Sequence, residues 1–320
     1  MAINVFDQFL KEFEQPITTF VSTSVSSLTS FVDGPLRMAV LLYVVLYGFA
    51  VMRGAIAEPI QEFAWRAMRL VVIVLLASNS SSFQQYVTDL FFTSLPKEIG
   101  NALGGSTLDA TSGQPFDKLL SKGIEVAYRI YDQAGLTNIA PALIAAILLV
   151  FVAFGSFLQF AVLLYAKIGL AIVIALGPIF IALALFEATR PFAEAWTRQV
   201  ANFLILHILV VALVGLMLTS VQGFVEKYGA NTSTAGALIV GAVAISAVLG
   251  LAAYIAIQLP AIAGGLAGGG ASLAARVVTS AITANAASAA VGAYAGAHAA
   301  ANRTAARIRA RRQGGEIRRV

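Results

Sequence analysis

Cysteine is absent from the 320-residue sequence, and charged residues are scarce. The absence of cysteine excludes a disulfide framework, a thiolate metal site and a cysteine nucleophile. Charged residues make up 12% of the chain, against about 25% in ordinary soluble domains. Apolar residues make up 59%, and the mean hydropathy is +0.84. This composition predicts a polytopic membrane protein of the all-α class.

Sets of residues that carry out catalysis are missing as well. The sequence has no Ser/His/Asp arrangement, no paired carboxylates and no metal-ligand spacing. The glycine-rich run from Gly264 to Gly270 is not followed by Gly-Lys-Ser or Gly-Lys-Thr, so it does not form a phosphate-binding loop. We therefore expect no enzyme activity, no bound cofactor and no metal ion.

The longest apolar stretch covers residues 139–186 and contains one charged side chain, Lys167. A single crossing of a bilayer takes about 20 apolar residues, so this stretch exceeds two crossings. Pro178 removes a backbone donor and disfavours helical angles at Gly177. In lipid such a break is tolerated only where protein or a water-filled space covers the freed carbonyls. We predict two packed membrane segments with a functional break at Gly177-Pro178, which makes both residues channel candidates.

The remaining chain divides by composition into further segments around this stretch. The first is an amphipathic N-terminal segment with a Ser/Thr-rich connector, which either lies in the headgroup plane or docks a partner. The predicted organisation is residues 1–35 as this segment, 36–78 as the first membrane helix pair, 79–138 as an extramembrane central region, 139–260 as a membrane helix bundle, and 261–320 as a Gly/Ala-rich and basic cytoplasmic tail. The fold expected is polytopic and helical, with about five crossings plus a re-entrant or broken segment.

Topology follows from the positive-inside rule, which places the seven arginines from Arg303 onward in the cytoplasm. The rule also favours the cytoplasm for Arg53, Arg66, Arg69, Arg190 and Arg198. The N-terminus is then outside and the number of crossings is odd, although six apolar segments are candidates. Either residues 70–77 fail to cross, which leaves 78–138 cytoplasmic, or residues 177–186 are re-entrant, which leaves that region periplasmic. Charge counting favours the first alternative.

Two ionisable residues lie within apolar sequence. His207 is a functional candidate because ionisable groups at membrane depth are costly, but a neutral imidazole hydrogen-bonded across a helix pair is the commoner case. Lys167 reads as a charge at a loop or interface between two segments more readily than as a gate. No acidic residue lies in a predicted span to complete a proton relay. Both residues are kept as channel candidates.

Two further sets are candidates for contacts between proteins or helices. The polar turn after the long apolar stretch is either a salt-bridged helix start or a docking site for a partner, and its candidates are Thr189, Arg190, Trp196 and Arg198. The last span has small residues four apart, which lets helices approach closely. These packing candidates are Ala242, Ser246 and Gly250.

Three blocks of sequence together resemble a known family. The first block runs from Tyr47-Gly48 through Arg53-Gly54 and Glu58-Pro59 to Trp65-Arg66. The second runs from Tyr86 through Leu95-Pro96 to Ala102. The third runs from Ala166-Lys167 through Gly177-Pro178 and Thr189-Arg190 to Trp196. Their order and spacing are similar to those of the TrbL-type polytopic inner-membrane subunit of bacterial type IV secretion and conjugation machines. The resemblance covers about residues 40–225.

The resemblance implies several copies at the inner-membrane base of an envelope-spanning channel, beneath a minor pilin stalk. Implied partners are inner-membrane scaffold proteins, ATPases, and a protein or protein–DNA substrate contacted by about Ser78–Asn138. Separately from the resemblance, the arginine tail could bind nucleic acid, anionic lipid or a partner protein, and we expect membrane lipid. The resemblance also implies a periplasmic N-terminus, a periplasmic central region and a cytoplasmic C-terminus, which favours the re-entrant alternative at residues 177–186.

Two functions compete at this point. The first is a non-catalytic channel or assembly subunit for conjugative transfer, which needs an external energy source. The second is a stand-alone small-solute transporter. Transporters usually show corresponding broken helices in two halves, whereas this sequence has a single Gly-Pro break, which favours the first function.

Overall fold

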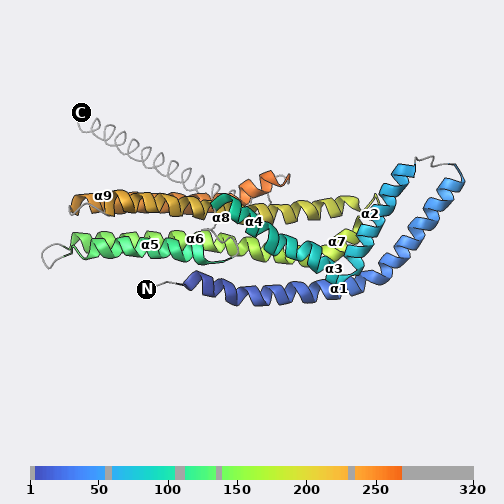
Figure 1. Cartoon of the computed structure of the whole chain (residues 1–320), viewed down its shortest axis with the longest axis horizontal. Helices are drawn as coiled ribbons and strands as arrows, with labels where there is room; N and C mark the ends of the chain where they lie inside the picture. Colours follow the sequence, from blue (N-terminus) through green and yellow to red (C-terminus); the bar gives the residue numbers. More distant parts are fainter. Residues whose placement is uncertain (1–3, 55–59, 105–111, 135–138, 230–234, 269–320) are drawn as a thin grey trace, which may run out of the picture. The chain divides into compact units, whose positions relative to one another are not determined.

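The computed structural model describes residues 4–54, 60–104, 112–134, 139–229 and 235–268 (Figure 1). Every regular element in these ranges is helical, which confirms the all-α class. The elements are α1 Val5–Met52, α2 Ile60–Ser78, α3 Ser80–Phe83, the π-helices η1 Gln84–Thr88 and η2 Leu90–Ser94, α4 Leu95–Gly104, α5 Gln114–Tyr131, α6 Ala140–Ala175, α7 Gly177–Leu183, α8 Arg190–Gly229 and α9 Ala235–Leu266.

Several helices meet the length and polarity of a membrane crossing. Within the described residues, α1, α6, α8 and α9 are long and apolar enough to cross a bilayer. A fifth crossing results if α2 and the helices that follow it count as one span, although the chain bends by 100° after Ser78. The prediction of a polytopic helical membrane protein with about five crossings is therefore confirmed.

Helix α1 differs from the sequence prediction, because it is one helix of 48 residues. We predicted a short amphipathic helix, a Ser/Thr-rich connector and then a separate span. The helix continues because its buried residues keep a spacing of three or four through the Ser/Thr-rich part, whose other residues mostly occupy the outer side. Its buried apolar residues are Phe6, Leu10, Val21, Val25, Val32 and Leu36.

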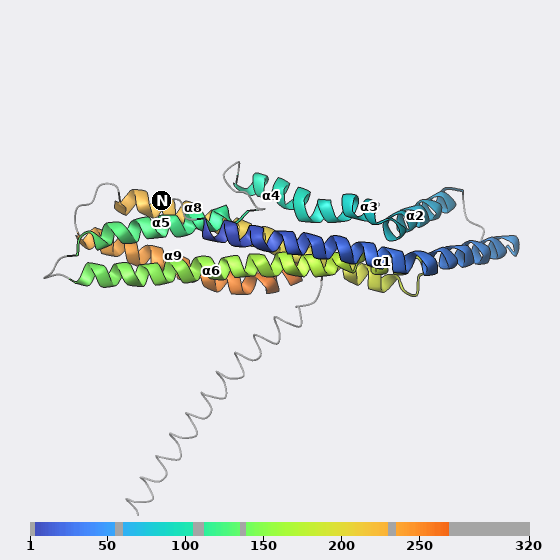
Figure 2. The same cartoon turned by 90° about the horizontal axis from the view of Figure 1, so that it is seen from below.

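A four-helix core is formed by α5, α6, α8 and α9, with the start of α1 packed against it (Figure 1, Figure 2). Helix α8 is the most enclosed of the predicted spans, with half of its apolar window buried. Further along, the middle of α1 packs with α3, α6 and α8 around Phe83 and Leu170. The chain thus brings its first helix against elements from the middle and the end of the sequence.

The C-terminal part of α1 leaves this core and pairs with α2 as a hairpin (Figure 1). Its base is held by a third apolar cluster, in which Val32 and Leu36 of α1 meet Ile73 and Ala77 of α2 and Leu185 after α7. Above the base, both helices expose large apolar side chains, among them Met38, Leu41, Trp65 and Met68.

The close approach of α6 and α9 depends on a residue that the sequence did not single out. A Cβ on Gly155 of α6 would lie 3.3 Å from the carbonyl oxygen of Leu249 in α9. The predicted packing residues of α9 behave differently from one another, because Ala242 is buried whereas Ser246 and Gly250 are half-buried. A Cβ on Gly250 would make an ordinary contact of 3.7 Å with Phe151. The space for a Cβ is therefore tighter at Gly155 of α6 than at Gly250 of α9.

The end of α9 also differs from the predicted boundary at residue 260. The helix continues through Pro260 to Leu266, because Leu259 and Ala263 extend its buried stripe past the proline. The basic tail predicted for residues 261–320 lies outside the described residues from 269 onward.

Candidate functional site

The predicted break at Gly177-Pro178 is present, since α6 ends at Ala175 and α7 begins at Gly177. The last carbonyls of a helix have no partner within it, and such groups are costly in lipid. One of them, the carbonyl of Val173, accepts a hydrogen bond of 2.7 Å from Nε1 of Trp196 in α8. The indole of Trp196 therefore satisfies part of the broken helix end from across the bundle.

Gly177 is required at the break because two rings close on it. An added Cβ would clash with the ring of Phe83 and would lie 3.0 Å from Cζ2 of Trp196. Phe83 is fully buried, so its ring has no open space to move into. Gly177, Phe83, Val173 and Trp196 together form what we call the junction.

The turn from α7 to α8 is closed by local hydrogen bonds. The hydroxyl of Thr189 donates to the carbonyls of Leu183 and Phe186, which lie at and beyond the end of α7. Arg190 begins α8 and forms an ion pair of 3.0 Å with Glu194, both about half exposed. Arg198 is exposed. Of the four predicted docking residues, Thr189 and Trp196 hold the protein's own turn and junction, and the two arginines lie at the surface.

A cavity of about 550 Å³ lies between the α1–α2 hairpin and this turn. Three arginines and two glutamates reach it from separate elements, and Arg66 sits over the ring of Tyr47 at 5.5 Å from its centroid. We call it the arginine-lined cavity. Its charged lining residues are Glu62, Arg66, Arg69, Glu187 and Arg190, and its aromatic ones are Tyr43, Tyr47, Trp65 and Phe186.

Lys167 lies inside α6, and not in a loop between two segments. Its ammonium is 3.0 Å from a carboxylate oxygen of Glu14 in α1, and its side chain is 7% exposed. Glu14 lies in the polar N-terminal part of α1, outside the apolar C-terminal part that makes this helix a candidate span. The pair ties α1 to α6. His207 is buried within α8, at 2% exposure.

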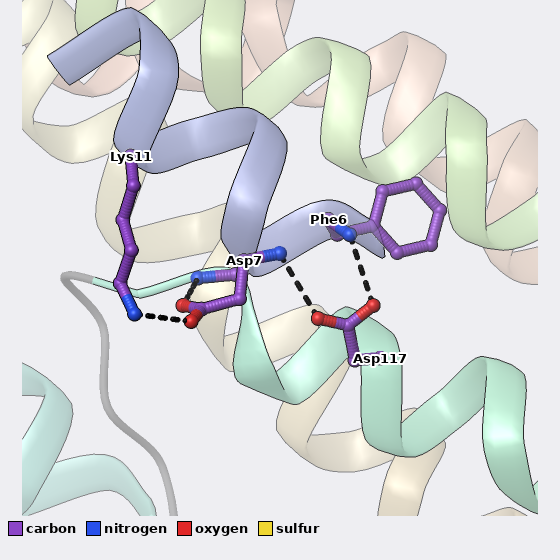
Figure 3. Close-up of polar contacts among 5 residues, drawn as sticks. Phe6, Asp7, Lys11 and Asp117 are labelled. Carbon is purple, nitrogen blue, oxygen red and sulfur yellow. Dashed lines mark hydrogen bonds and ion pairs between the residues drawn. The ribbon is translucent and has the colours of Figure 1, made fainter. Parts of the chain in front are cut away.

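Two aspartates join the start of α1 to the start of α5 (Figure 3). The carboxylate of Asp117 accepts hydrogen bonds of 2.9 Å from the backbone N–H groups of Phe6 and Asp7. In return, Asp7 accepts a bond of 3.2 Å from the N–H of Gly113 and pairs with Lys11 at 2.7 Å. Each helix N-terminus is thus capped by an acidic residue of the other, which satisfies its orphan donors.

The structure brings some predicted residues together and separates others. Gly177, Pro178, Thr189 and Trp196 gather at the junction and the turn beside it, whereas Lys167 and His207 lie deeper in α6 and α8. Sequence reasoning missed Phe83, Glu14 and the two capping aspartates. The two aspartates have a weak sequence signal, an acidic residue in the first turn of a helix, which does not identify the partner. No group of three or more metal-ligating side chains occurs in the part of the chain that the structure describes.

Comparison with known proteins places these features in a family. The model of the family described as TrbL/VirB6 plasmid conjugal transfer protein matches residues 40–259, which contain the junction, the turn and the cavity. The chain is similar to the type IV secretion system protein VirB6 of Bartonella henselae, with 33% identity over 204 residues, 63% of each chain. The corresponding protein of Bartonella quintana is 34% identical over 203 residues, 63% of this chain and 62% of that one.

A more distant relative is covered more fully. Protein VirB6 of Agrobacterium fabrum is 25% identical over 259 residues, which is 79% of this chain and 86% of that protein. The matches to the two Bartonella proteins span slightly less than two thirds of their length. The family model alone covers more than half of the present sequence. The protein is therefore a multi-pass membrane protein that belongs to the TrbL/VirB6 plasmid conjugal transfer family.

Proposed function

We propose that this protein is a non-catalytic channel and assembly subunit of a type IV secretion system in the bacterial inner membrane. Family membership supports the machine, because the relatives are named as its VirB6 proteins. One structural observation supports a channel role specifically: charged side chains are exposed at the depth of the apolar helices. The depth of these charged side chains in the membrane follows from where α1 and α5 lie along α6.

Helix α6 has 36 residues, so it is about 54 Å long at about 1.5 Å per residue. The hydrocarbon core of a bilayer is about 30 Å thick, so α6 extends beyond it. Helix α1 lies beside the C-terminal part of α6, since Phe6 packs on Phe160 with ring centroids 4.9 Å apart. Helix α5 lies beside the N-terminal part, where Gly123 packs against Val152. Any window of α6 that spans the core therefore has α1 or α5 next to it.

Both neighbouring helices expose charge at these depths. The side chains of Lys11 and Glu14 in α1 are 67% and 50% exposed, and those of Glu125 and Arg129 in α5 are 52% and 45% exposed. A charged side chain at the bilayer centre costs about 2.5–3.5 kcal/mol on insertion scales, so such a surface faces water or protein. We define the polar face as the exposed residues Gln8, Lys11, Glu12 and Gln15 of α1 with Lys118, Glu125 and Arg129 of α5.

Helix α6 presents the opposite kind of surface. Its exposed side chains at the same depth as α5 are apolar, and the five most exposed of the large ones have exposed fractions from 56% to 66%. This apolar face consists of Leu143, Ile147, Val150, Phe154 and Phe157. A membrane bundle with one charged and one apolar side places lipid on the second and an aqueous path on the first. We propose that several copies arrange their polar faces around a common path.

The proposed partners follow from the family. They are a minor pilin that forms a stalk, inner-membrane scaffold proteins, ATPases that supply the energy, and a protein or protein–DNA substrate. The proposed topology has a periplasmic N-terminus and a cytoplasmic C-terminus, with residues 79–138 contacting substrate. Arg190 and Arg198 are the surface residues of the turn that remain available as docking candidates.

The absence of cysteine makes the polar face directly testable, because single cysteines can be introduced without background. We would replace Gln15 and Lys118 on the polar face, and Val150 and Phe157 on the apolar face, one at a time. Cells that assemble the complete machine are then treated with a membrane-impermeant maleimide. Cysteines on the polar face should react, and those on the apolar face should not.

Equal reactivity at the two faces would remove the support for an aqueous path. The role in secretion is tested separately, by deleting the gene and measuring conjugative transfer. Transfer should stop and should return when the unaltered gene is supplied. Normal transfer without the gene, or uptake of a small solute by vesicles containing this protein alone, would contradict the proposed function.

A further inference from the structure

The arginine-lined cavity combines two kinds of surface that an amphiphilic ligand needs. Arg66 and Arg69 reach it from α2 and Arg190 from the start of α8, against Glu62 and Glu187, and Arg190 also pairs with Glu194 at 3.0 Å. Guanidinium groups bind phosphate oxygens through paired hydrogen bonds. The charged part of the cavity therefore fits one phosphodiester group.

An apolar groove of about 220 Å³ adjoins the cavity on the α1–α2 hairpin. It shares with the cavity Tyr43, Tyr47, Arg66 and Leu70. The rest of its lining is Val44, Phe63, Ala67 and Val71, without another charged residue. The shared residues lie between the two hollows, so the groove is a separate apolar surface of the hairpin. The lining of the cavity itself includes Leu46, Ala50 and Ile73 beside the charged residues, which matches a ligand with an anionic head and a hydrocarbon chain better than a free phosphate ion.

The surroundings indicate that the ligand comes from the membrane. Trp65 lines the cavity and is 64% exposed, and Tyr43 and Tyr47 stand beside it. Tryptophan and tyrosine are enriched at the level of the lipid headgroups, where arginine also extends its charge. The neighbouring residues of both hairpin helices expose apolar side chains, including Leu46 at 55%. The cavity thus has the residues of a headgroup layer and opens beside a surface suited to acyl chains.

We infer that the arginine-lined cavity binds the headgroup of an anionic phospholipid. Its phosphate lies among Arg66, Arg69 and Arg190, and one acyl chain lies against the apolar lining at Leu46 and Ala50. The lipid joins the hairpin to the turn that precedes α8, two elements that otherwise meet through the apolar cluster at the hairpin base. This inference depends on the chain being a membrane protein and does not depend on its role in secretion.

The test uses the full chain purified in an uncharged detergent. Its thermal unfolding midpoint is measured with increasing phosphatidylglycerol, with phosphatidylcholine of the same acyl chains, and with inorganic phosphate. A ligand that binds the folded state raises the midpoint. Phosphatidylglycerol should raise it, whereas the other two should not. Native mass spectrometry of the same samples should show the bound lipid.

Matched variants locate the site. Arg69→Gln, at an exposed position, should weaken phosphatidylglycerol binding about tenfold, as expected for the loss of one charge-assisted hydrogen bond. Arg198→Gln is the control, because this exposed arginine of α8 does not line the cavity, and it should leave binding unchanged. Glu187→Gln removes an anionic group from the lining and should strengthen binding.

Each opposite result overturns the inference. Equal stabilisation by the two lipids would show that no anionic headgroup is selected, and stabilisation by inorganic phosphate alone would show a free-anion site. An equal loss in Arg69→Gln and Arg198→Gln would place the effect in the general positive charge of the protein.

Discussion

Replacing Gly177 by alanine tests whether the junction is packed as tightly as its geometry indicates. The added Cβ would lie 3.0 Å from Cζ2 of Trp196 and would clash with the ring of Phe83. Real carbon contacts of this kind lie near 3.5–4.0 Å, so both rings must move by roughly half an ångström or more. Phe83 is fully buried and packed, and overpacking of such a core costs about 1–3 kcal/mol.

Gly250→Ala is the matched control, because its Cβ would make an ordinary contact of 3.7 Å with Phe151. Gly250 lies inside α9, so alanine there also gains helix propensity of about 1 kcal/mol, whereas Gly177 is the first residue of α7 and gains less. We expect the unfolding midpoint of Gly177→Ala in detergent to fall below that of Gly250→Ala by roughly 2–4 °C for each kcal/mol lost. Equal midpoints would refute the packing of Phe83 and Trp196 against Gly177.

Three further substitutions test the polar contacts. Trp196→Phe leaves the Val173 carbonyl without its indole donor and should lower stability by about 1–3 kcal/mol, measured by thermal unfolding in detergent. Glu14→Gln should destabilise the fold by less than the roughly 3–5 kcal/mol lost when a fully buried ion pair is broken, because Glu14 is half exposed. Adding Lys167→Met should recover part of this loss, and no recovery would contradict the pairing of Glu14 with Lys167. Asp117→Ala removes the cap of α1 and should cost about 0.5–2 kcal/mol, with faster proteolysis near the N-terminus as the readout.

The break at Gly177-Pro178 was predictable because its cause is local. A proline that follows a glycine weakens a helix locally, and α6 ends just before this pair, although α9 continues through Pro260. The membrane class was also predictable, because it depends on composition alone. The division of α1 into two elements was wrong for a related reason, since serine and threonine were read as a connector. On a helix that packs along one side, these residues occupy the outer face while Val21 and Val25 keep the buried stripe.

The partners across the bundle were not predictable from sequence. Glu14 and Lys167 are 153 positions apart, and Asp117 is 110 positions from Asp7, so local spacing carries no information about either pair. Phe83 similarly lies against Gly177 only because α3 packs on the end of α6. Sequence reasoning located the weak point of α6 and could not locate the side chains that cover it.

The distribution of charge on this bundle constrains how it exists in a membrane. A single chain in lipid would expose the polar face, whose several charged side chains each cost about 2.5–3.5 kcal/mol at the bilayer centre. This sum is comparable to the whole stability of a typical folded domain, about 5–15 kcal/mol. The apolar face has side chains four and three positions apart, from Leu143 to Phe157, which suits contact with lipid or with another helix. The arrangement proposed above, in which copies of this chain gather their polar faces around an aqueous path, would keep these charges away from lipid.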